Sequence, residues 1–253
     1  GEAVFIPKRN PQRETWNGRM YSIEDVVRLS GIKTVVDAAE LSGLLKALKS
    51  RSGFSSTSGF SLPPAFTNLY SLLPRNTRDE NGTREFRREA EFAGTLQGYE
   101  IQNGQAIFAK LRQIKSLYEL RLLQHAIDIS AEAHMRAMSN IGTLGWEYEV
   151  QAEIEYVFRR RNADYWGYPS IVGCGPNGTT LHYIESQGRI GRTDLMLIDV
   201  GAEYDHYTAD ITRTFPVNGK FTPAQRDIYT IVYDAQEAAA AKLRPGAMIS
   251  EAS

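Results

Sequence analysis

The stretch LIDVGAEYDHYTADITRTF, residues Leu197–Phe215, decides how the fold is interpreted, because it sets two carboxylates into a pair of apolar segments. Asp199 lies near the end of the first segment, and Asp210 lies in the middle of the second. Alternating β-branched and aromatic residues around a short polar turn predict an antiparallel β-hairpin. Side chains along a strand alternate between its two faces, and directly opposed residues of a hairpin share a face.

The register of this hairpin decides whether the two aspartates meet. If the turn is centred on Tyr204 and Asp205, Asp199 sits opposite Asp210, with the Cβ atoms roughly 4.5–5.5 Å apart. A three-residue turn over 204–206 would instead direct the two side chains to opposite faces. Facing carboxylates repel each other, so the pairing predicts either a shared proton or a bound cation.

The neighbours of Asp199 favour a site over a solvated surface. Three apolar side chains cover one face of its strand: Met196, Ile198 and Val200. On the other face, leucines lead up to Asp199, and a solvated hairpin face is rarely so apolar. The structural alternatives are an ion pair with Arg213 for Asp210 and a turn role for Asp205.

The chemistry that suits two such aspartates is divalent-metal binding. Oxygen ligands suit Mn²⁺, Mg²⁺ or Ca²⁺, and an added imidazole shifts the preference toward first-row metals. Two metals about 3.5–4 Å apart, bridged by carboxylates, would activate a water molecule and polarise a carbonyl. Asp199 and Asp210 cannot build that centre alone, so further ligands must come from elsewhere.

Among the histidines, His182 is the candidate for the reaction, because it follows a Gly/Pro loop and precedes Asp199 by 17 residues. Near a metal-bound carbonyl it could donate a hydrogen bond to the oxygen on which charge develops. The alternative is a hydrogen-bonded structural histidine. His125 and His134 lie in the first helical pattern, where we expect surface or core packing, and we expect His206 to face solvent in the turn.

The composition sets limits on the classes of function. The 253 residues carry a net charge of −1, with 42% hydrophobic and 23% charged residues, so no long-range field recruits nucleic acid or an anionic membrane. No apolar run approaches 18 residues and no signal peptide is visible. The single cysteine, Cys174, predicts a small buried residue and a cytoplasmic location. The first residue is Gly1 rather than Met, so we expect the natural start to lie elsewhere.

The sequence divides into residues 1–108, predicted as part of an α/β domain, and residues 109–253. In the first part we expect strands at EAVFI and AFTNLYSLL and helices at SIEDVVRLSGI and ELSGLLKALKS. Ser22 and Asp25 fit a helix start, where side-chain oxygens cap free amides. The charged segment 75–89 predicts a solvated surface.

The second part predicts three long helices around the hairpin. They are KSLYELRLLQHAIDISAEAHMRAM, GWEYEVQAEIEYVFRRRNA and TPAQRDIYTIVYDAQEAAAAKL, with a strand and Gly/Pro loop at YPSIVGCGPN. Ser116 and Glu119 fit a capping box, and Thr222 with Pro223 fits a helix start. The first helix is predicted from its apolar spacing, at Leu120, Leu123, Ile127 and Ala131.

A weak internal repeat links the first and last of these helices. A shift of 104 positions places Ile127 on Ile231 and Gly142 on Gly246. Such self-similarity would indicate two structural repeats. The second repeat would then begin near Thr222 and be cut off at Ser253, so we expect the chain to be a fragment.

Two segments resemble a known family. SIVGCGPNGTTLHY, followed by DLMLIDVGAEYDHYTADITRTFPVNGKFTPAQRDIY, is similar to the proline-specific branch of the methionine-aminopeptidase-like (M24) metallopeptidases, the Xaa-Pro aminopeptidases or aminopeptidase P. The helix from Lys115 resembles the one that opens the catalytic domain of that family. PKRNPQRETWNGR resembles a segment of its N-terminal domain through Trp16, Gly18 and Arg19.

The resemblance implies an α+β fold: the first half of a pita-bread catalytic domain, preceded by part of a creatinase-like N-terminal domain. It also implies two divalent metal ions, most often Mn²⁺, with Zn²⁺ or Co²⁺ as alternatives. Asp199 matches an aspartate that chelates one metal, Asp210 one that bridges both, and His182 a histidine that contacts substrate near the scissile bond. The family's other ligands, one histidine and two glutamates, would lie beyond Ser253.

The function implied is removal of an N-terminal residue that precedes proline, by a hydroxide bridging the two metals. The partners are then peptides with proline at the second position, with a homodimer or higher homo-oligomer expected from the family. Two alternatives stay open: an Xaa-Pro dipeptidase (prolidase), and a non-catalytic pita-bread module that binds without turnover. Without the missing ligands, we expect this chain alone to be inactive.

Overall fold

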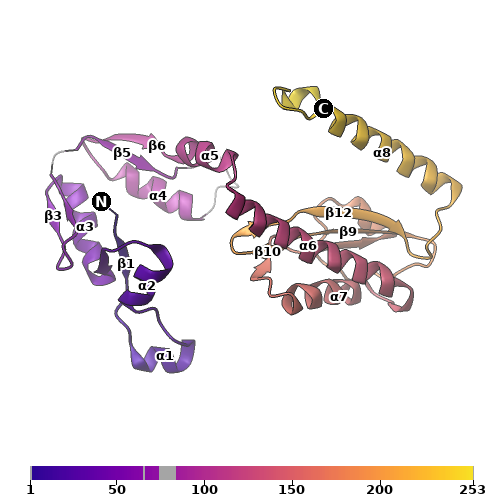
Figure 1. Ribbon diagram of the computed structural model, residues 1–253, viewed down its shortest axis with the longest axis horizontal. Coiled ribbons are helices and arrows are strands. Elements are labelled where there is room, and N and C mark those ends of the chain that lie inside the picture. The colour runs from indigo at the N-terminus through magenta and orange to yellow at the C-terminus, as the bar shows by residue number, and fades with distance from the viewer. Residues whose placement is uncertain (1, 65, 74–83, 253) are drawn as a thin grey trace. The chain divides into compact units, whose positions relative to one another are not determined.

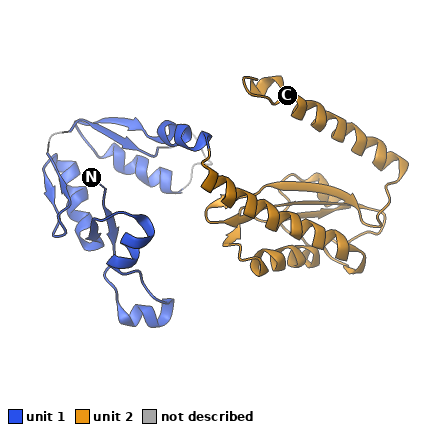
Figure 2. Ribbon diagram, viewed as in Figure 1, with its two compact units in different colours: residues 1–114 blue, residues 115–253 orange. Residues whose placement is uncertain are grey.

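The computed structural model describes residues 2–64, 66–73 and 84–252, and divides the chain into two compact units. Unit 1 is Gly1–Ile114 and unit 2 is Lys115–Ser253 (Figure 2). The boundary expected from the sequence lay six residues earlier, between 108 and 109. It lies later because helix α5 (Gln105–Gln113) belongs to unit 1.

The described part of unit 1 combines short parallel strand pairs with helices (Figure 1). The strands pair as β1 (Val4–Ile6) with β2 (Val35–Asp37), β5 (Asn68–Ser71) with β6 (Glu100–Asn103), and, antiparallel, β3 (Phe54–Ser55) with β4 (Ser61–Leu62). The helices besides α5 are α1 (Pro11–Asn17), α2 (Ile23–Ser30), α3 (Leu41–Ser50) and α4 (Arg84–Gly94). The strands and helices expected in this part of the sequence are therefore present.

Helix α2 begins where its cap was predicted. Ser22 Oγ accepts the amide hydrogen bond of Asp25 at 3.2 Å, and Asp25 Oδ2 accepts that of Ser22 at 3.1 Å. This reciprocal pair satisfies two amides that the helix itself cannot. Of the charged segment 75–89, residues 75–83 lie outside the described residues, and the remainder forms the largely exposed start of α4.

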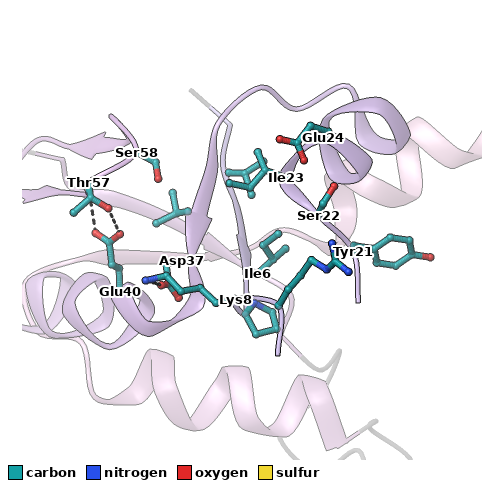
Figure 3. A pocket seen from close by; sticks show the side chains of 14 residues that line it. Ile6, Lys8, Tyr21, Ser22, Ile23, Glu24, Asp37, Glu40, Thr57 and Ser58 are labelled. Carbon is teal, nitrogen blue, oxygen red and sulfur yellow. Dashed lines mark hydrogen bonds and ion pairs between the residues drawn. The ribbon is translucent and has the colours of Figure 1, made fainter. Parts of the chain in front are cut away.

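A hollow of about 640 Å³ lies at the carboxyl ends of β1 and β2 in unit 1 (Figure 3). Charged groups at its rim are paired with partners of their own. Lys8 Nζ lies 3.0 Å from Asp37, and Glu40 accepts hydrogen bonds from the amide and the hydroxyl of Thr57 at 3.0 and 2.6 Å.

Unit 2 is built on a three-stranded antiparallel sheet in the order β12-β9-β8. Its strands are β8 (Ile171–Cys174), β9 (Leu195–Val200) and β12 (Ile211–Pro216). A smaller sheet continues the same hairpin through β10 (Ala202–Tyr204) and β11 (Tyr207–Thr208), and adds β7 (Tyr165–Trp166). The predicted strands and their hairpin therefore exist.

Two helices, α6 (Leu117–Asn140) and α7 (Glu147–Arg160), cover one face of the sheet (Figure 1). The predicted apolar face of β9 packs beneath them, with Met196, Ile198 and Val200 fully buried. Since side chains alternate along a strand, Asp199 points to the opposite face. That face carries the candidate site.

Helix α6 is present as predicted, and it buries a different face from the one that carries the apolar spacing. The buried side chains are Ala126, Ile129, Ser130, Ala133, His134 and Ala137, whereas the leucine-rich stripe is partly or wholly exposed, Leu120 by 47%. Small residues let the helix approach the sheet closely, and the hydroxyl and imidazole find hydrogen-bond partners there, which a count of apolar residues cannot show.

The predicted helix starts are confirmed in unit 2. Ser116 and Glu119 form a capping box at α6. Thr222 and Gln225 form one at α8 (Pro223–Lys242), with Pro223 in the first turn.

No residue of α8 is buried. None of the helices in the described ranges is long and apolar enough to cross a bilayer. The 104-residue repeat stays a prediction.

The junction between β9 and β10 requires a glycine. A Cβ built on Gly201 would lie 1.7 Å from the carbonyl oxygen of Ala209. We expect Gly201→Ala to lower the free energy of unfolding by about 1–3 kcal/mol or more, in urea denaturation followed by tryptophan fluorescence. Gly142→Ala is the matched control, because a Cβ there meets nothing within 4 Å, and it should stay within about 0.5 kcal/mol of the parent. Equal stability of the two variants would contradict the close approach.

Candidate metal-binding site

The hairpin register differs from the predicted one. Asp199 pairs with Thr212, so the prediction that Asp199 sits directly opposite Asp210 is wrong. The turn lies one residue later than expected, at Asp205 and His206, whose φ angles are 47° and 68°. Two successive positive φ angles are the pattern of a two-residue type I′ turn, which matches the twist of the flanking strands.

The two aspartates nevertheless share a face, because the shift changes the register by an even number of positions. Asp210 lies two residues before Thr212, the partner of Asp199, and is therefore its diagonal neighbour. Diagonal neighbours in an antiparallel pair have Cα atoms about 7–8 Å apart, within reach of polar side chains that lean toward each other. The same-side arrangement predicted from the sequence is present.

Tyr168 brings the two carboxylates together. Its hydroxyl lies 2.5 Å from Asp199 Oδ1 and 3.0 Å from Asp210 Oδ1. The distance between Asp199 Oδ1 and Asp210 Oδ1 is therefore at most the sum of their two distances from the Tyr168 hydroxyl. Since a hydroxyl has one hydrogen, it can donate to only one carboxylate at a time, so the arrangement leaves negative charge that a cation would neutralise.

The backbone holds Tyr168 at the interruption of the hairpin. The amide of Gly167 donates to the carbonyl of Gly201 at 2.8 Å. A Cβ on Gly167 would lie 2.8 Å from Thr208, so the close approach again uses a glycine. The hydrogen bond therefore fixes the segment that carries Tyr168 against Gly201, the residue that directly follows β9.

Tyr168 was not among the residues predicted from the sequence. It lies in the stretch assigned to a strand, and nothing in its spacing marks the hydroxyl as functional. Burial and the hydrogen bond to Asp199 raise the pKa of Tyr168 far above 10, so the hydroxyl stays protonated and remains a donor at neutral pH. The signal available in the sequence was Gly-Tyr-Pro at residues 167–169, shortly before the buried strand β8.

A pocket of about 370 Å³ surrounds these groups. It is lined by Tyr168, Pro169, Ile171, His182, Ile184, Asp199 and Asp210. The structure therefore places all three candidate residues of the sequence analysis in one pocket. His182 is exposed, and its pocket neighbours besides the carboxylates and the tyrosine are apolar.

Helix α6 fixes the hairpin on both sides of its interruption. Ser130 Oγ accepts the amide hydrogen bond of Ala202 at 2.9 Å, and His134 Nε2 donates to the carbonyl of Ile211 at 3.0 Å. Burial lowers the pKa of His134, so the ring is a neutral donor at pH 7. Ile211 follows Asp210 directly, and the contact therefore anchors the strand that carries this aspartate.

The other groups weighed from the sequence have structural roles. Arg213 donates to the carbonyl of Thr212 at 2.7 Å and forms no ion pair with Asp210 within the described ranges. The remaining predictions are confirmed: His125 packs edge-on against Tyr204, and His206 is exposed in the turn. Cys174 is buried as predicted, and burial raises the pKa of its thiol.

The donor set fits part of a metal centre. Two carboxylates at one hydroxyl offer oxygen ligands of the kind that Mn²⁺ and other divalent ions take. Across residues 2–64, 66–73 and 84–252, however, no group of three or more His, Cys, Asp or Glu side chains could hold a metal ion. In the described part of the chain, Asp199 and Asp210 are thus the acidic pair that would hold an ion at this pocket.

Comparisons with known proteins show which family the chain resembles. The model of metallopeptidase family M24 matches residues 121–253, and that of the aminopeptidase P N-terminal domain matches residues 1–55. An Xaa-Pro aminopeptidase of Haemophilus influenzae is 34% identical over 250 residues, which are 98% of this chain and 53% of the relative. That of Escherichia coli is 47% identical over 142 residues, 56% of this chain and 32% of the relative.

A solved structure shows the same fold. Zinc-substituted Escherichia coli aminopeptidase P in complex with product has a TM-score of 0.75 and 30% identity, and the match covers 98% of this chain and 54% of that one. The likeness confirms the expected fold class, a mixed α and β arrangement corresponding to part of a pita-bread enzyme. These two matches cover almost all of this chain but only about half the length of each relative.

The shared hydroxyl predicts a measurable contribution to stability. Tyr168→Phe should lower the free energy of unfolding at pH 7 by about 1.5–3 kcal/mol, because hydrogen bonds to charged groups are worth about that much. Tyr70→Phe, at an exposed tyrosine of unit 1, is the control and should change it by less than about 0.5 kcal/mol.

The sign of the pH dependence follows from the raised pKa of Tyr168. The contribution should be fully present below pH about 10, the ordinary tyrosine pKa, and be lost only as the pH rises beyond it toward the folded-state pKa. Urea denaturation at several pH values between 7 and 10 checks this. A stability difference between parent and Tyr168→Phe that vanishes within that window would contradict the shared hydrogen bond.

Proposed function

Because the chain belongs to metallopeptidase family M24, whose model matches more than half of it, we propose that the full-length protein is a metal-dependent exopeptidase specific for Xaa-Pro peptides. It removes an N-terminal residue that precedes proline. The observation that carries this proposal is the position of Asp199 and Asp210 at one Tyr168 hydroxyl, beside His182.

The aspartates are the proposed metal ligands. Asp199 would bind one divalent ion and Asp210 would bridge two, with the ions being Mn²⁺ or alternatively Zn²⁺ or Co²⁺. Such ions, when bound, polarise a carbonyl and lower the pKa of a water molecule so that it can attack at neutral pH. Tyr168 fixes the orientation of both carboxylates, since its hydroxyl contacts one oxygen of each.

His182 is the proposed substrate contact. His182 is exposed and lines the pocket, and its ring N–H can donate to the carbonyl oxygen of the first residue as negative charge develops there. The apolar pocket residues Pro169, Ile171 and Ile184 suit the pyrrolidine ring of the second residue. The proposed partners are accordingly peptides with proline at position two.

An inactive or purely binding role is the second candidate for the isolated 253-residue chain. The observation that favours it is the lack of a third acidic, cysteine or histidine ligand near Asp199 and Asp210 in the described part of the chain. A homodimer or higher homo-oligomer, and a cytoplasmic location, stay predictions.

The catalytic proposal is tested in the full-length protein with Mn²⁺ and an Xaa-Pro-Xaa tripeptide. Asp210→Asn should lower kcat/KM by about 10³-fold or more, because losing a bridging carboxylate removes several kcal/mol of transition-state stabilisation. Asp205→Asn makes the same change in charge at the turn, where asparagine tolerates the positive φ, and should leave kcat/KM within about twofold. An Asp210→Asn variant with more than a tenth of the parent activity would refute the proposal.

The same assay separates the related specificities. An Xaa-Pro aminopeptidase should cleave the tripeptide in preference to an Xaa-Pro dipeptide, and the reverse preference would assign a dipeptidase.

For the 253-residue chain alone, calorimetric titration with Mn²⁺ should show only weak binding, because two carboxylates cannot satisfy two ions. Asp199→Asn should weaken even that binding. Stoichiometric, tight uptake of two ions would overturn this expectation and show that the chain carries a complete centre.

A further inference from the structure

Glu147, the first residue of α7, is a fully buried carboxylate that the proposed chemistry does not use. Within the described ranges it forms no ion pair. An isolated charge in a protein interior is costly unless hydrogen-bond donors surround it. The location of those donors therefore indicates what the carboxylate holds in place.

Four groups donate to Glu147, and all lie between the end of β8 and Gly188. Oε1 accepts from the amide of Cys174 at 2.7 Å and from Asn177 Nδ2 at 3.0 Å. Oε2 accepts from the hydroxyl of Tyr183 at 2.8 Å and from the amide of Gly188 at 2.6 Å. One carboxylate thus ties together both ends and the middle of a single segment.

Within the segment 175–187, which we call the His182 segment, several residues near His182 are exposed to solvent. Leu181 is 88% exposed, and His182 and Ile184 are exposed as well. The residue after His182 is Tyr183, whose hydroxyl donates to Glu147. It also accepts from Asn177 Nδ2 at 3.0 Å and from the amide of Gln187 at 3.2 Å. His182 is therefore adjacent to the segment's central anchor.

Strain in the His182 segment indicates that these anchors determine its shape. Ser186 has a φ of 50°, which a residue with a Cβ adopts only at a cost, and its side chain is buried. Its Oγ finds no hydrogen-bond partner within the described ranges. Backbone strain of this kind persists only where the surroundings over-determine the conformation, and it clusters at functional sites.

Gly188 shows how closely the anchor fits. A Cβ at this position would lie 2.5 Å from Asn177 Nδ2 and 2.7 Å from Glu147 Oε1. The carboxylate and the segment therefore meet at a distance that only glycine permits.

We propose that Glu147 is a positioning residue that sets the geometry of His182 toward the substrate. The inference rests on the proposed Xaa-Pro peptidase function. Glu147 does not touch the pocket, which is lined by other residues. It acts through Tyr183 and the backbone of the His182 segment, in the way that outer-shell hydrogen bonds orient the groups that contact a substrate.

The test is a double-mutant cycle in the full-length protein. Glu147→Gln keeps the shape of the side chain but replaces one acceptor oxygen with a donor, so at least one of the four donors loses its acceptor. We expect kcat/KM to fall about 10–100-fold, as for other outer-shell changes. In a His182→Ala background the same substitution should cost less than about threefold, because the positioned ring is gone.

Two further variants make the cycle decisive. Glu153→Gln is the matched control, since Glu153 lies on the same helix but pairs with Arg136, and it should stay within twofold of the parent. Tyr183→Phe removes a single donor and should lower kcat/KM about three- to tenfold. It carries the test should Glu147→Gln fail to fold. The proposal would be overturned if Glu147→Gln, or Tyr183→Phe, lowered kcat/KM by the same factor in the parent and in the His182→Ala background.

Hydrogen exchange of the same full-length proteins separates this inference from the proposed function. The amides of the His182 segment should exchange at least tenfold faster in Glu147→Gln or Tyr183→Phe, and unchanged in Glu153→Gln. Unchanged exchange in both of the first two variants would refute the positioning role whatever the enzyme cleaves. Failure of the parent to cleave any Xaa-Pro peptide would instead refute the proposed function, and with it the role of Glu147 in that reaction.

Discussion

Two negative charges held on one side of a hairpin are the constraint on which the rest of unit 2 depends. Two unit charges about 5 Å apart repel by about 3 kcal/mol at an effective dielectric of about 20. Tyr168 donates only one hydrogen to the pair, so it relieves part of this repulsion and leaves an excess of carboxylate oxygens. A site that is unfavourable by itself and favourable with a cation is what the proposed metal-binding role of Asp199 and Asp210 requires.

The helices that form the core also support the site on the opposite face. From α6, Ser130 and His134 fix the backbone on either side of the hairpin interruption, next to the aspartates. From the start of α7, Glu147 fixes the segment that carries His182. These three buried polar residues are therefore arranged to place side chains that lie outside the core. Each of the three forms hydrogen bonds to the backbone or side chains that it positions.

The features that follow from local rules were predicted from the sequence. Strand alternation predicts the hairpin and the common face of Asp199 and Asp210. Side chains a few residues apart predict the helix caps at Ser22 and Ser116. Asp199 and Asp210 share a face although the predicted register was wrong, because a register shift by an even number of residues leaves each side chain on the same face of its strand. Features that depend on contacts across the fold were missed: Tyr168 is 31 positions from Asp199, and Glu147 is 36 from Tyr183. The face that α6 buries does not follow from its apolar spacing, because polar and small residues form that face.

The most direct test of the central claim is a crystal structure of the full-length protein grown with Mn²⁺, with anomalous scattering recorded at the manganese edge. The structure predicts an anomalous peak with an oxygen of Asp199 and an oxygen of Asp210 each at about 2.0–2.2 Å from a metal, a usual metal–carboxylate distance. A peak elsewhere, or two aspartate side chains turned to opposite faces of the hairpin, would contradict it.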